Sequence, residues 1–265
     1  MSIDKINFNT PYRFGQFKSS EQFITPVFKG QEPSKTVKAM SIIGSTLGTS
    51  IALALISKRQ GFSLKKIKQT PIKDWAIFKI DNKKRDPLKI DEAEILTLAT
   101  GSILGGLLAG NVVDRNNRDA KRREAITQFL GNVLIPVSFV SLTSKIYNRY
   151  ENKIKAIVPQ FKTNGKKSLK YVNKFFKNIP VIAMTMLALI AGIKTGNVIT
   201  NTINEKRFGQ TKKRDLKTTD FAPHVDDLSL AITLMGSKSL LTNAVTRTVP
   251  IFLTVPGYQV GKAQN

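Results

Sequence analysis

The feature that most constrains the fold is an uncharged segment, residues 95–113, which a basic run follows at once. At about 19 residues, it is long enough to cross the hydrocarbon core of a bilayer as a helix. Its glycines fall four apart, Gly101 with Gly105 and Gly106 with Gly110. Small residues at this spacing let two helix backbones approach closely in lipid. The segment therefore predicts a membrane-spanning helix that packs through glycine.

Three other segments share this character and predict three more spans. Residues 39–57 are uncharged, carry Gly44 and Gly48, and end at a cationic flank that closes with Gly61. The other two segments are residues 125–143 and 179–193.

Further sequence features bear on the start, the connection and the number of these spans. Pro180 is expected in the first turn of the fourth segment, where proline is tolerated. The link at 114–124 is short, which favours an antiparallel hairpin of the second and third segments. Residues 228–245 and 250–260 are weaker apolar segments that suit a kinked span, a re-entrant hairpin or a packed surface helix.

These segments together predict an all-α fold, a multi-pass transmembrane bundle of about four to six hydrophobic helices with glycine-mediated packing. A polar amino-terminal arm covers residues 1–38, and the membrane domain covers 39–265. Basic loops are expected at 58–94, 144–177 and 200–227. The arm has no hydrophobic signal core, so we expect an integral membrane protein without a cleavable signal peptide.

The charge of the chain is strongly basic, with 42 Lys+Arg against 18 Asp+Glu and a net charge of +24. Such a chain is attracted to an anionic partner, which would be nucleic acid, an anionic lipid surface or an acidic protein. Cytoplasmic loops of membrane proteins usually carry more Lys and Arg than the loops on the other side. Four alternating spans would leave 21 basic residues on each side, so this rule does not orient the chain. The chain contains no cysteine, which excludes disulfides and cysteine-ligated metal sites.

One lysine-rich stretch, residues 168–177, places its apolar and basic side chains mostly on opposite helical faces. Lys170, Lys174 and Lys177 lie on the basic face. This pattern is typical of a helix that lies along a membrane surface and contacts anionic headgroups. The alternative is the solvated face of an ordinary globular helix.

Polar residues inside the apolar segments are candidates for a polar path through the membrane. Gln128 and Asn132 lie four apart, hence on one helical face, and Pro136 one turn later is expected to open the backbone. Lys194 falls near the end of the fourth segment. Intramembrane polar groups often mark a pathway. The alternatives are hydrogen bonding between helices for Gln128 and Asn132, and snorkelling of Lys194 to the interface.

No catalytic or cofactor site emerges from the sequence, and we expect a protein that is not an enzyme and needs no cofactor or metal. The glycine cluster at 101–110 lacks the lysine of a phosphate-binding loop. His224 is the only histidine, and although two aspartates follow it, we expect those aspartates to cap the next helix. One histidine with no second cluster assembles neither a metal site nor a nucleophile and its base.

Short repeats also occur, because Gly-Asn-Val appears at Gly110, Gly131 and Gly196. They indicate either repeated helical hairpins or chance matches among glycine-rich helices.

Three functions fit these patterns. The first is a structural or assembly subunit of a membrane, which contacts the bilayer and homo-oligomerises or joins other subunits through its glycine faces. The second is a channel or transporter with a polar intramembrane path. The third is a peripheral or soluble basic helical protein that binds nucleic acid or anionic lipid.

Overall fold

The computed structural model describes residues 32–61, 92–162, 167–210, 213–225 and 251–264, and all secondary structure in these ranges is helical. The predicted arm up to residue 31, residues 62–91 of the first basic loop and the apolar segment 228–245 lie outside the described residues. The same holds for the two aspartates that we expected to cap a helix after His224.

Within the described ranges, four helical runs are long and apolar enough to cross a membrane, as the sequence predicts. They are α1 (Lys35–Arg59), α3 (Glu92–Val113), the run Arg115–Ile157 and α6 (Lys167–Phe208). The third run consists of η3 (Arg115–Asn117), α4 (Arg118–Ile126), the π-helix η4 (Thr127–Leu134) and α5 (Ile135–Ile157). The chain is therefore a multi-pass membrane protein on the evidence of its helix lengths and composition.

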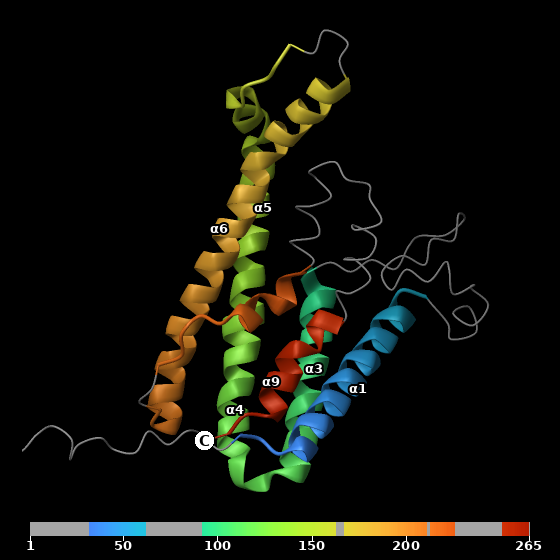
Figure 1. The fold of residues 1–265 in the computed structure, drawn as a ribbon, viewed down its shortest axis with the longest axis vertical. Helices are drawn as coiled ribbons and strands as arrows, with labels where there is room; N and C mark the ends of the chain where they lie inside the picture. The colour runs from blue at the N-terminus through green and yellow to red at the C-terminus, as the bar shows by residue number, and fades with distance from the viewer. Residues whose placement is uncertain (1–31, 62–91, 163–166, 211–212, 226–250, 265) are drawn as a thin grey trace, which may run out of the picture. The chain divides into compact units, whose positions relative to one another are not determined.

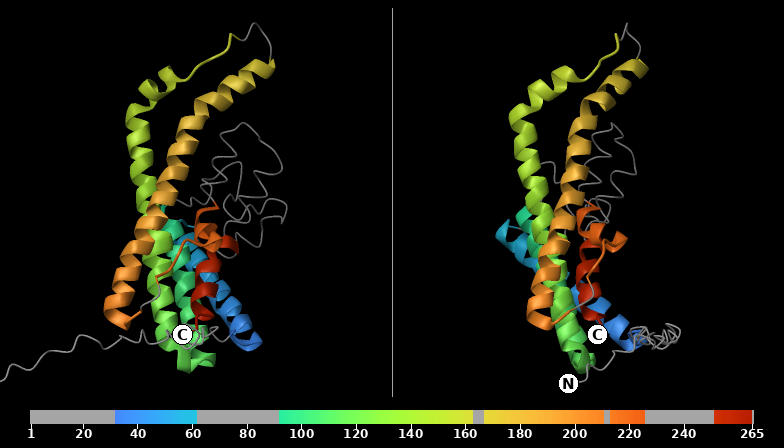
Figure 2. Two further views of the ribbon diagram at one scale, coloured as in Figure 1. Left: turned by 60° about the vertical axis from the view of Figure 1, so that its left-hand side comes forward. Right: turned by 90° about the vertical axis from the view of Figure 1, so that its left-hand side faces the viewer.

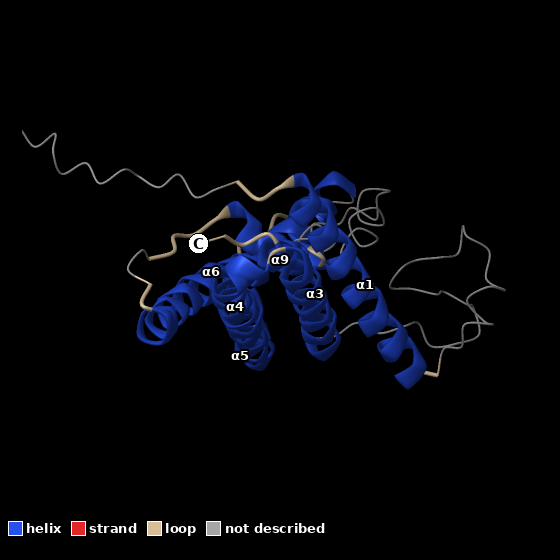
Figure 3. Ribbon diagram, turned by 90° about the horizontal axis from the view of Figure 1, so that it is seen from below, coloured by secondary structure: helices blue, strands red, loops and turns tan. Residues whose placement is uncertain are grey.

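The four runs stand side by side in one curved row, in the order α6, α5, α3, α1 (Figures 1 and 3). Neighbours in the row are antiparallel, as the colour gradient along each helix shows (Figure 1). For α1 and α3, the glycine contacts agree, because Gly44 faces Gly105 and Gly48 faces Gly101. Two short helices, η5 (Thr218–His224) and α9 (Val255–Gly261), pack on one side of the row against α3 and η4 (Figures 2 and 3).

Helix α3 places its glycines against two different neighbours. A Cβ added at Gly101 or Gly105 would overlap the backbone of Gly48 or Gly44 on α1. A Cβ at Gly106 or Gly110 would instead overlap the backbone of α9 at Gly257 or Gly261. Gly106 and Gly110 each lie five residues after their counterparts in the first pair. Because each residue turns the helix by about 100°, this shift places the second pair on a different side of α3, where it meets a different partner. Both partners belong to the same chain.

The sequence also explains how α1 begins and ends. Ser34 precedes the helix, and its hydroxyl accepts a hydrogen bond from the backbone N–H of Val37 at 3.3 Å. At the other end, Gly61 has a φ of 79°, a conformation that glycine adopts without steric cost. The stop that the sequence predicts at Gly61 is confirmed, whereas the helix begins at Lys35 and so takes four residues from the predicted arm.

The apolar core is small, and the outer face of the row is apolar as well. Buried residues of α1, α3, η4 and the range 251–264 form one cluster that includes Ile56, Leu98, Val133 and Leu253. Large side chains nevertheless remain exposed on α1 and α3, and they line an open apolar groove of about 710 Å³ between the two helices. Lipid tails would solvate such a surface, so exposed leucines and isoleucines are expected on a helix that spans a bilayer.

Two predictions about the second half of the chain are wrong. Pro180 does not lie in a first turn, because α6 begins at Lys167 and contains Pro180 in its interior. The upper part of α6 is inclined to its lower part (Figure 1), which is what an interior proline causes. Residues 144–177 are also not mainly a loop, because α5 continues to Ile157 and α6 starts at Lys167. The basic stretch therefore extends the two spanning helices, and residues 168–177 are continuous with the fourth span.

Candidate functional site

A line of buried polar side chains lies between η4 and α6 and is closed by residues 213–224 of the chain. We call it the polar seam. Its members on the third helical run recur at intervals of three or four residues, and its members on α6 do the same. Each set therefore shares one helical face. The polar seam consists of Glu124, Thr127, Gln128, Asn132, Asn197, Thr200, Asn201, Asn204, Arg214 and Asp220.

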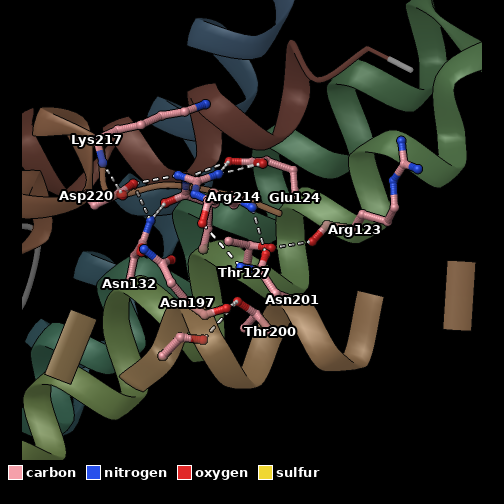
Figure 4. A network of polar contacts seen from close by, with 12 residues as sticks. Arg123, Glu124, Thr127, Asn132, Asn197, Thr200, Asn201, Arg214, Lys217 and Asp220 are labelled. Atoms are coloured by element: carbon pink, nitrogen blue, oxygen red, sulfur yellow. Dashed lines mark hydrogen bonds and ion pairs between the residues drawn. The ribbon is translucent and has the colours of Figure 1, made fainter. Parts of the chain in front are cut away.

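Arg214 joins two carboxylates at the edge of the polar seam (Figure 4). Its Nη1 donates to both carboxylate oxygens of Glu124, at 2.7 and 2.9 Å, and its Nη2 donates to Asp220 at 2.5 Å. The side chains of Arg214 and Asp220 are only 9% and 0% exposed. Burial lowers the pKa of Arg214, but the two carboxylates raise that pKa by more, so the guanidinium stays charged.

Asn132 lies at the centre of the polar seam and is fully buried. Its Nδ2 donates to Gln128 Oε1 at 3.1 Å and to Asp220 Oδ1 at 2.7 Å. Gln128 in turn donates from Nε2 to Glu124 at 2.7 Å. Because an ionised carboxylate only accepts hydrogen bonds, the bond to Asp220 fixes which end of the Asn132 amide carries the nitrogen.

Pro136 explains both the π-helix and the place of the only histidine. In an α-helix the carbonyl of Asn132 would accept from the N–H four residues later, but residue 136 is proline and has none. The helix widens into η4 just before Pro136. The Asn132 carbonyl instead lies 2.8 Å from His224 Nε2, which must donate because a carbonyl only accepts.

Two further hydrogen-bonded contacts hold α6 in the polar seam. Asn201 on α6 pairs with the backbone of Arg214, donating to its carbonyl at 3.2 Å and accepting from its N–H at 3.0 Å. Asn204 donates to the hydroxyl of Thr127 at 3.0 Å. The seam thus fastens α6 and residues 213–224 to the third helical run.

A second polar cluster lies around the turn after α3, before the apolar part of the third run begins. Lys121 is fully buried and donates to Asp114 at 2.7 Å and to the carbonyl of Ala263 at 3.1 Å. Asn117 donates to Asp114 and to Gln264, and Gln264 donates to Asp114 at 2.9 Å. Burial raises the pKa of Asp114, but these hydrogen bonds lower it by more, so the pKa lies below its usual range. The cluster clamps residues 263–264 to the turn after α3.

Comparison with known proteins adds no family. No protein-family model, no curated protein and no solved structure matches this chain. What the seam does must therefore be argued from its own geometry.

The structure brings together only part of the predicted polar path. Gln128 and Asn132 are buried and hydrogen-bonded to each other, whereas Lys194 is exposed on α6. At that level α6 contacts the third run through Gly192 and Gly196, each two residues from Lys194 and thus on the opposite face of the helix. Lys170 and Lys174 are exposed and Lys177 is half-buried. All three precede residue 179, where the fourth apolar segment begins.

Sequence reasoning missed most of the seam. One signal was present on α6, because Asn197, Thr200, Asn201 and Asn204 follow the spacing of a single helical face. Arg214 and Asp220 gave no such signal, since they lie in a polar connection where charged residues are ordinary. Within the described residues no group of three or more His, Cys, Asp or Glu side chains forms a metal site.

Proposed function

We propose that this multi-pass membrane protein is a non-enzymatic structural or assembly component whose rigid bundle presents a basic arm to anionic lipid headgroups. We call residues 144–177 the basic arm. The observation that carries the proposal is its charge, because it holds ten Lys and Arg residues against one acid, Glu151, at the free end of the α5–α6 hairpin.

The position of the arm's lysines along α6 supports contact with headgroups. With a rise of about 1.5 Å per residue, Lys177 lies about 3 Å and Lys174 about 8 Å along the helix before Ile179, where the apolar segment begins. The headgroup layer is roughly 5–8 Å thick on each side of a bilayer. Lys177 and Lys174 therefore suit headgroup depth, whereas Lys170, about 13.5 Å before Ile179, lies outside that layer. The exposed ring of Tyr171 adds an amphipathic side chain of the type enriched at membrane interfaces.

The rest of the bundle suits a scaffold. We propose that close glycine packing holds α1, α3 and α9 together, because their backbones leave no room for a Cβ at the paired glycines. These glycine faces are occupied within one chain. We therefore propose that they stabilise the subunit rather than join copies of it. The charged groups of the polar seam are likewise bonded to one another, which fixes the helices in one arrangement.

The headgroup proposal predicts that replacing Lys170, Lys174 and Lys177 with glutamine weakens retention of phosphatidylglycerol by at least about tenfold, since each lysine near an anionic surface contributes about 1 kcal/mol. Native mass spectrometry of the detergent-purified protein would count retained phosphatidylglycerol against phosphatidylcholine. A matched variant, with glutamine at Lys194, Lys206 and Lys213, removes the same charge outside the arm. Equal losses in both variants, or a preference for RNA over lipid, would contradict the proposal.

A second candidate function is a channel or transporter, and the observation that favours it is the polar seam itself. Charged and amide side chains inside spanning helices often mark a solute path, and π-helices are frequent at functional sites. This function predicts ion flux in proteoliposomes that falls at least about tenfold when Asn132 becomes leucine, because the replaced side chain sits at the seam's centre. Ser138→Ala, on the exposed face of α5, is the control. Absence of flux through the folded, reconstituted wild type would reject this candidate.

A further inference from the structure

Two Gly-Asn pairs face each other where η4 crosses α6. A Cβ at Gly196 would lie only 2.7 Å from the Cα of Gly131, so the two backbones touch at these glycines. The next residue in each helix is an asparagine, Asn132 or Asn197, and Figure 4 shows the two side chains next to each other. Asn132 is 0% and Asn197 6% exposed, so both amides are sealed inside the protein. The repeated Gly-Asn-Val motif thus brings two amides together.

Both amides have a side-chain oxygen without a donor. Within the described part of the chain, Oδ1 of Asn132 and Oδ1 of Asn197 are buried and lack a hydrogen-bond partner. Exchanging the oxygen and nitrogen of the Asn132 amide does not give the oxygen a donor, because Nδ2 already donates to the carboxylate of Asp220. An unsatisfied buried oxygen costs about 1–3 kcal/mol. Two such oxygens on neighbouring side chains favour a species that both can bind.

The charge around these oxygens is negative. Glu124 and Asp220 carry two carboxylates, and Arg214 supplies one guanidinium. The Lys217 side chain extends away from Asp220 in Figure 4, and Lys217 contacts Asp220 through its backbone, donating from its N–H and accepting at its carbonyl. Together, Glu124, Asp220 and Arg214 carry one more negative charge than positive charge. Buried charges are stable only when they are compensated, which favours a cation.

The available ligands select a monovalent ion. The carboxylate oxygens already accept hydrogen bonds from Arg214, from Asn132 and from the backbone of Lys217, so they do not offer the anionic ligands that a divalent ion needs. What remains are neutral amide oxygens, with the hydroxyl of Thr200 close to Gly131. That hydroxyl donates to the carbonyl of Gly196 at 2.9 Å, which leaves its own lone pairs free. Such neutral oxygens coordinate sodium and potassium in membrane proteins.

We propose that Asn132 and Asn197 bind one monovalent alkali cation through their side-chain oxygens, with Thr200 and water completing its coordination. The ion neutralises the excess negative charge of the polar seam and links η4 to α6. The proposal concerns binding alone and does not depend on either function proposed above.

Thermal unfolding of the detergent-purified protein tests this site. Sodium or potassium chloride should raise the Tm by about 5 °C over N-methyl-D-glucamine chloride at equal concentration, because a ligand that binds only the folded state stabilises it. Asn197→Ala should abolish this shift, whereas Asn197→Asp should enlarge it by adding a charged ligand. Asn111→Ala is the matched control, since Asn111 follows Gly110 in the same motif and also has a buried, unpartnered Oδ1 among the described residues.

Equal Tm values of the wild type in all three salts would overturn the proposal and assign these oxygens to bound water. A shift that persists in Asn197→Ala would overturn it as well, because the ion would then bind elsewhere. If Asn197→Ala fails to fold, equilibrium binding of radioactive sodium to the wild type decides, with one ion per chain expected and no saturable binding as the contrary result. A dependence on pH but not on the cation would overturn the proposal too, because a bound proton would then balance the charge.

Discussion

Replacing Arg214 with methionine is expected to destabilise the protein by about 3–5 kcal/mol, because it leaves two carboxylates without the counter-charge that they share. Both carboxylates bond the guanidinium directly, and Asp220 is fully buried. Methionine keeps much of the volume of the side chain, so the loss reports charge and hydrogen bonding rather than a cavity. Thermal unfolding in detergent should show a Tm lowered by roughly 10 °C.

Two further variants decide whether that loss arises from the buried charges. Lys217→Met removes a positive charge three residues away whose side chain is exposed, so its Tm should match the wild type. Adding Glu124→Gln and Asp220→Asn to Arg214→Met removes the uncompensated charges and should restore part of the stability. An Arg214→Met protein that unfolds at the wild-type temperature would show that the polar seam does not hold the bundle together.

Replacing Gly105 with leucine is the second change with a large expected effect, a loss of at least about 3 kcal/mol from overpacking. The new side chain would occupy the space of the Gly44 carbonyl on α1, and backbone cannot move aside as a flexible side chain can. Gly105→Ala should show an intermediate loss, because the Cβ alone already overlaps that carbonyl. The Tm of each purified variant measures the effect.

The control for Gly105→Leu lies on the same helix. Val112 is 67% exposed, so Val112→Leu adds bulk toward the surrounding lipid or detergent and should leave the Tm unchanged. If Gly105→Leu were as stable as Val112→Leu, α1 and α3 would tolerate a wider separation, and close glycine packing would not be what holds them together.

The four spans could be predicted because each is a local feature of the sequence, a run of 15–19 uncharged residues near charged flanks. The pairing of Gln128 with Asn132 was also predictable, since residues four apart share a helical face. The partners of Asn132 were not, because Asp220 lies 88 residues further along the chain. A single sequence shows neighbours along one helix, but it does not show which distant polar segment folds back against that helix.

Lys194 and residues 168–177 show a second limit of prediction from a single sequence. Lys194 lies in an apolar run, and its charge alone made it a candidate for the polar path. Its orientation depends on which face of α6 contacts the third run, and Gly192 and Gly196 decide that by allowing the backbones to touch. Likewise, residues 168–177 have the pattern of a separate surface helix, but the pattern does not state where a helix begins. Only the structure shows it to be continuous with the span.

The parallel contact of α9 with α3 has a consequence for synthesis of the protein. The hydroxyl of Ser102 accepts from the N–H of Gly257 and donates to the carbonyl of Thr254, residues made about 150 positions later by the ribosome. The α1–α3 pair can form early in translation, whereas the glycine row that faces α9 stays uncovered until residues 255–261 have emerged. Such long sequence separation slows folding and leaves a period in which an exposed glycine face can bind other helices. A membrane chaperone that covers α3 would act during that interval.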